Sequence, residues 1–364
     1  MNQCSRCVMD TSAKNIVFNE QGECNFCSDF MKKISIHNAI GNNELRLFAE
    51  KVKRDGKGKP YDCIVGVSGG VDSSYSLYLA KSVGLRPLAV HMDNGFNSEL
   101  AVNNIANLVE KLGVDLYTHV INWDEYRDML LAFLKAGVID LELLYDNAML
   151  AVNYSQASKY GIKYILSGSN SSTEGIAMPN GWNWFKFDAK NIRSIHSEFG
   201  TVKSKTFPYF SVLKYNYYKF VKKIEWISFL DFVDYNKNEA MAFLQKEFAF
   251  KPYPYKHYES IFTRFYQGYI LPNKFGIDKR KLHFSTLICT GQMNRDEALE
   301  KLRGIAYPSE IDLKTDMDFV CKKLGLSAQD FEKYMSSNIK QHDCYGTEQG
   351  LYFAIGKIIK KMKI

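Results

Sequence analysis

The sequence predicts an α/β protein in which a doubly wound parallel sheet lies between a small cysteine-rich module and a largely helical C-terminal region. Apolar, strand-like runs alternate with helix-like segments between residues 63 and 166, a pattern that implies a parallel sheet with helices on both faces. Two pairs of cysteines lie within the first 27 residues, and aromatic residues concentrate in the second half. We therefore expect three parts, at residues 1–40, 41–200 and 201–364.

The composition is that of a globular protein with a substantial core. The 364 residues are 46% hydrophobic and the net charge is +7, which is modest for this length. This charge fits phosphorylated small molecules better than a nucleic-acid backbone, so nucleic acid is not the expected partner, with tRNA left open as an alternative. There is no signal-peptide pattern, and no apolar run approaches the roughly 18 residues that cross a bilayer. We expect a soluble protein without a membrane partner.

Four apolar runs are expected to form the strands, at residues 63–67, 86–92, 116–121 and 163–166, with helices at 75–80 and 103–112. The ligand of such a sheet lies at the carboxyl ends of its strands. Three loops meet this criterion, and they begin at Ser68, His91 and Ser167. These loops therefore supply the candidate binding residues.

The most specific motif is the first of these loops, Ser-Gly-Gly-Val-Asp-Ser-Ser, which stands between a strand and a helix. Free backbone N–H groups at a helix N-terminus bind phosphate, glycines let the backbone approach the ligand, and serine hydroxyls add donors. The loop has no Gly-Lys-Ser ending, so it is not the P-loop of ordinary ATPases, and it lacks the glycine spacing of a dinucleotide site. All seven residues are candidates for nucleotide binding, and Ser68, Asp72 and Ser73 also for catalysis: Ser68, Gly69, Gly70, Val71, Asp72, Ser73 and Ser74.

The acidic residue of this loop has two interpretations. Asp72 ligates the magnesium ion that accompanies a triphosphate, or it caps the following helix. In the second loop, His91, Met92 and Asp93 are expected to flank the adenosine, with a turn cap as the alternative for Asp93. The third loop adds further nucleotide-binding candidates, namely Gly168, Asn170 and Glu174.

The front of the chain carries two Cys-x-x-Cys pairs, Cys4 with Cys7 and Cys24 with Cys27. This spacing places four thiolates tetrahedrally around one zinc ion. A strand at residues 16–18 and a hairpin turn at 19–22 are expected between the pairs, so residues 1–40 are predicted to form a zinc ribbon. Four thiolates leave no position for water, so this zinc is expected to be structural. A redox pair and metal-free packing cysteines are the alternatives.

The loop at residues 68–74 resembles the pyrophosphate loop of the ATP pyrophosphatases, a group that includes GMP synthetase, asparagine synthetase, NAD synthetase and the tRNA thiolases. These enzymes cleave ATP between its α and β phosphates and place AMP on a substrate oxygen. The resemblance implies ATP with Mg²⁺ as cofactor, residues 41–200 as the nucleotide-binding domain, and a cytoplasmic location.

Two further segments, Trp182-Asn-Trp184 and Lys274 to Arg295, extend the resemblance over nearly the whole chain. With the cysteine pairs and the pyrophosphate loop, they are similar to the bacterial N-acetyl sugar amidotransferases. That family acts in the biosynthesis of O-antigens and of the nonulosonic acids, such as pseudaminic and legionaminic acid, that decorate flagellin. The resemblance implies conversion of an acetamido group into an acetamidino group through an O-adenylyl imidate, with residues 201–364 as a mostly helical substrate or partner domain.

Acceptor residues follow from this chemistry. Lys274 and Arg280, as catalytic candidates, and Lys281 and Arg295 offer counter-charges to pyrophosphate or to an acidic substrate, with a solvated basic face as the alternative. Aromatic and basic candidates for substrate binding are Trp182, Trp184, Arg193 and His196, and His283 is considered with His196 as a proton carrier. Ordinary packing is the alternative for each of them.

Nitrogen has to come from elsewhere, because residue 2 is Asn and no Gly-x-Cys-x-Gly elbow is present. The resemblance implies a separate glutaminase with a barrel-like companion that supplies ammonia. The principal rival is a tRNA thiolase, which shares the adenylylation step and needs a reactive cysteine, for which Cys289 is the candidate. A zinc module that binds nucleic acid is a further alternative.

Overall fold

The computed structural model describes residues 2–37, 43–253 and 258–361, with the side chains of 35–37 left aside. The expected boundary at residues 40 and 41 and the tail residues 362–364 lie outside them. The boundary at residues 200 and 201 stays a prediction, although the sheet takes its last strand from beyond it.

A five-stranded, entirely parallel sheet forms the centre of the molecule. Its strands are β1 (Cys63–Gly66), β2 (Pro87–Asp93), β3 (Leu116–Val120), β4 (Tyr164–Ser167) and β5 (Glu225–Ser228), in the order β3-β2-β1-β4-β5. In β1, Val65 pairs with Ala89 of β2 on one side and with Leu166 of β4 on the other. The four expected strands are present, and β5 is an addition. Its four residues are too short and too polar to stand out in a helical, aromatic stretch of sequence.

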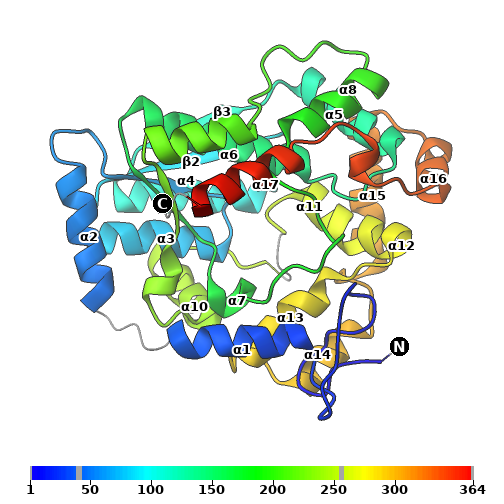
Figure 1. The fold of residues 1–364 in the computed structure, drawn as a ribbon, viewed down its shortest axis with the longest axis horizontal. Helices are drawn as coiled ribbons and strands as arrows, with labels where there is room; N and C mark the ends of the chain where they lie inside the picture. The colour runs from blue at the N-terminus through cyan, green and yellow to red at the C-terminus, as the bar shows by residue number, and fades with distance from the viewer. Residues whose placement is uncertain (1, 38–42, 254–257, 362–364) are drawn as a thin grey trace.

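Helices cover both faces of the sheet (Figure 1). On one face, α2 (Asn43–Asp55), α3 (Val71–Ser82), α4 (Glu99–Leu112) and α10 (Lys237–Phe248) pack on the side chains of Cys63 and Val65. On the other face, α5 (Trp123–Ala136) and α6 (Leu143–Lys159) pack on Ile64, with α8 (Ala189–Phe199) outside them. Successive strand residues point to opposite faces, so a sheet buried on both sides needs the continuous apolar runs seen in β1 and β2.

The C-terminal half is helical. Short elements lead into it: α7 (Ser171–Glu174), α9 (Val212–Asn216), the π-helical turn η1 (Tyr217–Val221) and the 3₁₀ turn η2 (Phe229–Phe232). The elements after residue 260 are α11 (Ile261–Phe265), the π-helical turn η3 (Tyr266–Ile270), α12 (Leu271–Phe275), α13 (Lys279–Cys289), α14 (Arg295–Leu302), α15 (Glu310–Leu324), α16 (Ala328–Ser336), the 3₁₀ turn η4 (His342–Cys344) and α17 (Gln349–Lys361). None of the helices in the described ranges combines the length and the apolar character that crossing a bilayer requires.

The N-terminal module packs beside α1 (Asn25–His37), α13 and α14 (Figure 1). The expected strand at residues 16–18 does not form: Phe18 makes only an isolated antiparallel bridge with Cys24. The hairpin turn does form, since the N–H of Gly22 donates to the carbonyl of Asn19 at 2.9 Å. Strand pairing in the module is limited to isolated bridges. Its compact form therefore depends on the packing of its buried cysteines and on its contacts with α13.

Candidate active site

The loop at residues 68–74 lies where the strand order of the sheet reverses. β1 is followed by α3 and pairs with β2 on one side, whereas β4 approaches it from the other side. The carboxyl ends of two strands whose connections leave in opposite directions form a crevice, which is the usual ligand site of an open parallel sheet. The structure therefore brings the loop after β1 and the loop after β4 to one place.

The backbone of this loop is shaped to receive an anion. Gly70 is the N-cap of α3 and supplies no side-chain cap, so the first N–H groups of the helix, which have no intrahelical acceptor, face outward. The Ser73 hydroxyl accepts the N–H of Ser68 at 3.1 Å and fixes the curve of the loop. Gly69 has φ of 83°, and a Cβ there would lie 2.7 Å from the carbonyl oxygen of Ala101. Only glycine fits this position.

Asp72 lies in the first turn of α3 and is not its N-cap. Its Oδ1 accepts a hydrogen bond of 2.5 Å from the hydroxyl of Tyr235. Burial, followed by the Asp72 carboxylate, raises the pKa of Tyr235 well above its ordinary value, so the phenol stays protonated and keeps donating. The capping interpretation of Asp72 is therefore wrong, and its carboxylate lines a cavity instead.

That cavity has a volume of about 550 Å³. Three carboxylates line it, those of Asp72, Glu174 and Glu259, together with the lysines Lys237 and Lys301. Oxygen ligands of this kind suit Mg²⁺, which is normally held by one or two carboxylates together with the phosphates of its nucleotide. The donor set therefore fits a magnesium–triphosphate complex at the N-terminus of α3.

Sequence reasoning missed Lys237 and Glu259, which line this cavity, and Tyr235, which donates a hydrogen bond to Asp72. They come from the segments around β5 and α10 and from the turn before α11, more than 160 residues after the loop. None of them stands in a motif. Glu259 approaches the loop because its carbonyl accepts the N–H of Ser98 at 2.9 Å, and this bond places its side chain over Gly70.

The loop after β4 supports the phosphate loop directly. A Cβ at Gly168 would lie 2.7 Å from the backbone of Asp72 and Ser73, so the two loops touch through their main chains. Asn170 caps α7 through the N–H of Thr173 at 2.8 Å and does not line the cavity. Glu174, at the end of α7, does line it. Of the three candidates, Gly168 and Glu174 therefore reach the cavity, and Asn170 shapes the loop between them.

The second expected loop lies inside β2 and does not line the cavity. The Nδ1 of His91 donates to the carbonyl of Val67 at 2.9 Å, and its Nε2 accepts from Asn97. Asp93 accepts the N–H of Gly95 at 2.7 Å, which makes it the turn cap considered as its alternative. Met92 is buried. Of these residues, His91 alone supports the loop at residues 68–74, through its hydrogen bond to Val67.

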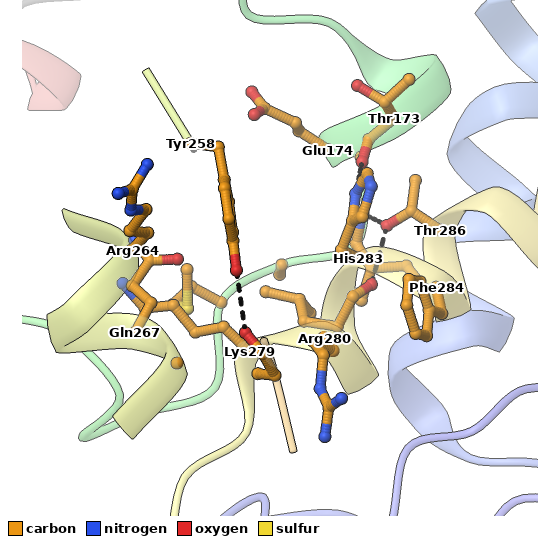
Figure 2. Close-up of a pocket in the computed structure, with 17 residues that line it drawn as sticks. Thr173, Glu174, Tyr258, Arg264, Gln267, Lys279, Arg280, His283, Phe284 and Thr286 are labelled. Atoms are coloured by element: carbon orange, nitrogen blue, oxygen red, sulfur yellow. Dashed lines mark hydrogen bonds between the residues drawn. The ribbon is translucent and has the colours of Figure 1, made fainter. Parts of the chain in front are cut away.

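A second cavity, drawn in Figure 2, has a volume of about 460 Å³. Glu174, His283 and Phe284 line both cavities and so form their common wall. Figure 2 shows Glu174 and His283 facing Arg264 and Gln267 across the second cavity, with Tyr258 beside them. The Nδ1 of His283 donates to the carbonyl of Thr173 at 3.1 Å, which fixes the orientation of the ring. A ligand in the second cavity would lie directly beside the first cavity.

The cations of the second cavity each have their own carboxylate. Arg264 pairs with Asp316 at 2.5 Å, and Lys279 pairs with Glu142 at 3.1 Å. Each of these pairs carries no net charge, and the carboxylate of Glu174 also lines the cavity. The second cavity is therefore built for a polar, uncharged group more than for an anion.

Arg280 lines the second cavity, but its guanidinium is used within the protein. Its Nε and Nη2 donate to Asp278, and its remaining N–H groups donate to the carbonyls of Lys301, Gly304 and Ile305 at 2.9–3.2 Å. Its donors all have acceptors, so none is left for a phosphate. The expected catalytic role gives way to a structural one, in which Arg280 ties α13 to the end of α14.

Lys274 lies away from both cavities. Its Nζ donates to the carbonyls of Tyr334 and Ser337 at 2.6 and 2.7 Å. A lysine that binds the last carbonyls of α16 caps the helix C-terminus. Lys274 is thus a helix cap, and the expectation that it neutralises pyrophosphate is not met.

The expected sugar-stacking residues are part of the packed interior. Trp182 is buried. Trp184 stacks on His342 with ring centroids 4.8 Å apart, and its Nε1 donates to Asp188 at 3.0 Å. Burial lowers the pKa of His342 to about 4, so this ring is neutral at neutral pH. Trp182 therefore lies in the core, and Trp184 is half-buried with one ring face against His342.

Arg193 and His196 lie on α8, on another side of the molecule. The guanidinium of Arg193 covers the ring of Tyr209 at 4.3 Å. The Nε2 of His196 hydrogen-bonds to Asp128 at 2.9 Å. Despite its burial, hydrogen bonds from Val202, Thr201 and His196 lower the pKa of Asp128 to about 2. Neither residue lines the two central cavities.

Lys281 and Arg295 connect the N-terminal module to the helical half. Lys281 pairs with Asp10 at 2.5 Å. Arg295 donates to the carbonyls of Cys4 and Cys7 at 3.0 and 3.1 Å. The expectation that they bind substrate is therefore replaced by a role in docking the cysteines.

The four N-terminal cysteines form a buried cluster. Their sulfur atoms all lie within 4.8 Å of one another, with Cys4–Cys27 and Cys7–Cys24 at 3.7 Å. A tetrahedral ion with Zn–S bonds of about 2.3 Å requires S···S separations of about 3.8 Å. These distances are too long for disulfide bonds. The backbone N–H of Cys24 also points to the sulfur of Cys4 at 3.1 Å, so the donor set fits zinc.

Cys289, the cysteine that a thiolase would need, lies next to the four-cysteine cluster. A hydrogen bond with Cys27, together with burial, raises the pKa of its thiol. It lines neither of the two central cavities. Because Cys289 faces the four-cysteine cluster and not the loop at residues 68–74, the thiolase alternative lacks its candidate nucleophile.

Two family models match different parts of the chain. Residues 43–174 match the NAD synthase model, and residues 259–362 match the model of the LPS biosynthesis protein WbpG-like, C-terminal domain. The first covers the phosphate loop and β1 to β4, and the second begins at Glu259 and includes α13. No curated protein is significantly similar to the chain in sequence.

Solved structures overlap with parts of the fold. The NH3-dependent NAD synthetase from Campylobacter jejuni subsp. jejuni NCTC 11168 is 17% identical over 44% of this chain and 72% of its own, with a TM-score of 0.30. NMN synthetase from Francisella tularensis is 14% identical over 59% of this chain and 98% of its own, with a TM-score of 0.30. Because these overlaps are partial, the fold is assigned from the strand order and the family models. The chain combines an NAD synthase-like nucleotide region with a WbpG-like C-terminal region.

Proposed function

We propose that the protein is an ATP-dependent amidotransferase that converts the acetamido group of a bacterial sugar into an acetamidino group in surface-glycan biosynthesis. The observation that carries the proposal is the common wall of Glu174, His283 and Phe284 between the two cavities. A nucleotide at the phosphate loop and an acceptor in the second cavity would meet there. The near-neutral lining of the second cavity suits an uncharged acetamido group.

The reaction has two steps. The amide oxygen attacks the α-phosphate of ATP, the bond from that phosphorus to the bridging oxygen of pyrophosphate breaks, and an O-adenylyl imidate forms. Ammonia then adds to the imidate carbon, the C–O bond to AMP breaks, and loss of a proton leaves the amidine. An amide oxygen is a poor leaving group, so adenylylation is what makes this displacement possible.

Different residues would bind the phosphates, hold magnesium and take up a proton. The first N–H groups of α3 and the hydroxyls of Ser68 and Ser73 would stabilise the departing pyrophosphate. Asp72 and Glu174 would hold magnesium, which supplies counter-charge to the triphosphate when it is bound. His283, fixed by Thr173, lies where a proton of the acceptor or of ammonia could be taken up.

Ammonia would be supplied by a separate glutaminase with a barrel-like companion, as the family resemblance implies, and the reaction would take place in the cytoplasm. Ammonium salts at high concentration should replace this partner in vitro. The alternative, a thiolase, has lost its candidate nucleophile because Cys289 faces Cys27.

The test is incubation with ATP, ammonium chloride and a panel of N-acetyl sugars in which the acetamido oxygen carries a heavy-oxygen label. We expect AMP and pyrophosphate in equal amounts, a product in which NH has replaced O, and transfer of the label into AMP. Formation of ADP, or AMP without the label, would contradict the proposal. Ala177→Trp, which narrows the second cavity, should raise the KM of the acceptor and leave that of ATP nearly unchanged.

A further inference from the structure

One outer surface of the molecule exposes a row of apolar side chains on α9 and η1. Leu213, Tyr217, Phe220 and Val221 are 39–65% exposed. They follow one another at spacings of four, three and one residues, which places them along one side of the helical stretch. Large apolar side chains that are contiguous and exposed mark an interaction surface.

The C-terminal helix α17 extends this surface. Tyr352 seats the helix against Tyr215 of α9, with ring centroids 6.5 Å apart, yet none of the residues of α17 is buried. Leu351, Phe353 and Ile358 are 40–61% exposed. Figure 1 shows α17 lying across the outside of the molecule. We call the outward side chains of residues 213–223 and 351–361 the lysine-rich face.

The charge of this face has one sign. Residues 212–223 contain four exposed lysines and residues 349–361 contain three, and neither range contains Asp or Glu: the lysines are Lys214, Lys219, Lys222, Lys223, Lys357, Lys360 and Lys361. These seven lysines account for the whole net charge of +7, so the rest of the chain carries no net charge. A partner that matches this face must be anionic.

The arrangement of charge and apolar side chains narrows the partner. The Nζ of Lys219 lies 5.5 Å from the ring of Phe220, and that of Lys222 lies 5.8 Å from the ring of Tyr217, so cations flank exposed aromatic rings. Lysine is depleted in protein–protein interfaces, where arginine is enriched, and the face contains no arginine. Exposed apolar and aromatic side chains bordered by lysines are typical of helices that lie in the surface of a bilayer.

We propose that the lysine-rich face binds the surface of a bilayer that contains anionic lipids. Phe220, Val221 and Phe353 enter the boundary between headgroups and acyl chains, and the lysines lie among the anionic headgroups. The protein rests on the membrane and does not span it. This inference departs from the expectation of no membrane partner and does not depend on the proposed reaction.

The full-length protein is sedimented with vesicles of phosphatidylcholine alone and of phosphatidylcholine mixed with phosphatidylglycerol. We expect binding to the mixed vesicles only, weakened as the salt concentration rises. The triple variant Lys219→Glu, Lys222→Glu, Lys223→Glu should lower the bound-to-free ratio more than tenfold. Phe220→Ser with Val221→Ser, which keeps the charge, should lower it severalfold.

The matched control reverses the charge of three exposed lysines outside this face. This variant, Lys57→Glu, Lys246→Glu, Lys333→Glu, should bind vesicles as the unaltered protein does. Circular dichroism confirms that each variant is folded. Three results would overturn the proposal: equal loss of binding in the control, equal binding to both vesicle types, or no binding. Self-association that the face variants abolish in the absence of lipid would instead identify a second copy of the chain as the occupant.

Discussion

At the scale of single residues, the chemistry of the site depends on which polar groups are already occupied. Asp72 accepts one hydrogen bond from Tyr235 and still lines the nucleotide cavity. Arg280, in contrast, donates its hydrogen bonds to Asp278 and to three backbone carbonyls. A group can serve a ligand only with the donors or acceptors that the fold leaves over.

For Asp72→Asn we expect AMP release to fall by about 100-fold or more, because the amide cannot replace a carboxylate as a ligand of magnesium. Tyr235→Phe removes only the hydrogen bond that orients Asp72, so its loss should be about tenfold. Initial rates over a range of magnesium concentrations separate the two effects. Unchanged turnover in Asp72→Asn would remove this residue from the mechanism.

The buried His342 makes stability depend on pH. Burial lowers its pKa to about 4, against about 6.5 for an unfolded chain. Below pH 6.5 the unfolded state binds the proton more readily, so the free energy of unfolding should fall as the pH drops from about 6.5 to about 4. The expected loss is about 3 kcal/mol, and it should be absent in His342→Gln. Urea unfolding at each pH measures it, and an identical pH profile for both proteins would show that another group titrates.

At the scale of elements, two loops share the work of shaping the nucleotide site. The loop after β1 supplies the helix N-terminus, and the loop after β4 presses against it at Gly168. The contact is between backbone atoms, so neither loop can shift alone. A larger residue at position 168 would therefore displace the loop after β1.

For Gly168→Ala we expect AMP release to fall by about tenfold or more, because the added Cβ would lie 2.7 Å from the backbone of Asp72 and Ser73 and displace the phosphate loop. The control is Gly350→Ala, where a Cβ meets open space. ATP binding and turnover are measured for both. Equal activity of the two variants would show that the loops do not have to stay in contact.

At the scale of the whole molecule, the cysteine module is joined to the two central cavities through α13. Lys281 pairs with Asp10, and Ser285 accepts the N–H of Val8 at 3.2 Å. The same helix provides His283 and Phe284 to both cavities. The module therefore positions the wall on which the proposed reaction depends.

We predict that the four cysteines hold a structural zinc ion and that its removal by a strong chelator lowers the melting temperature by about 10 °C or more. AMP release should disappear as well, because α13 loses its anchors. Zinc added back should restore both, and zinc content by atomic absorption should be near one per chain. Cys344→Ser, at an exposed site, should change neither quantity. A metal-free protein with unchanged stability would contradict the prediction.

The parts of the site that could be predicted from sequence are those whose geometry is local. The phosphate loop is set by a strand, two glycines and a helix start within twelve residues, and the cysteine cluster by two short spacings. Several residues expected to bind the acceptor have partners within the protein instead, for one physical reason. Lys281, Arg295 and Trp184 carry suitable chemistry, but whether such a side chain is free is decided by what packs against it.

The sequence alone therefore determined four of the five parallel strands, the loop at the end of the first strand, and the four-cysteine cluster, because each follows from a pattern or spacing over a few residues. The tertiary structure decided where an acceptor would lie, since the second cavity is assembled from α7, η3 and α13, which only packing brings together. It also decided which charges remain available. Ion pairs form between residues far apart in the chain, as between Lys279 and Glu142, and no local pattern encodes them.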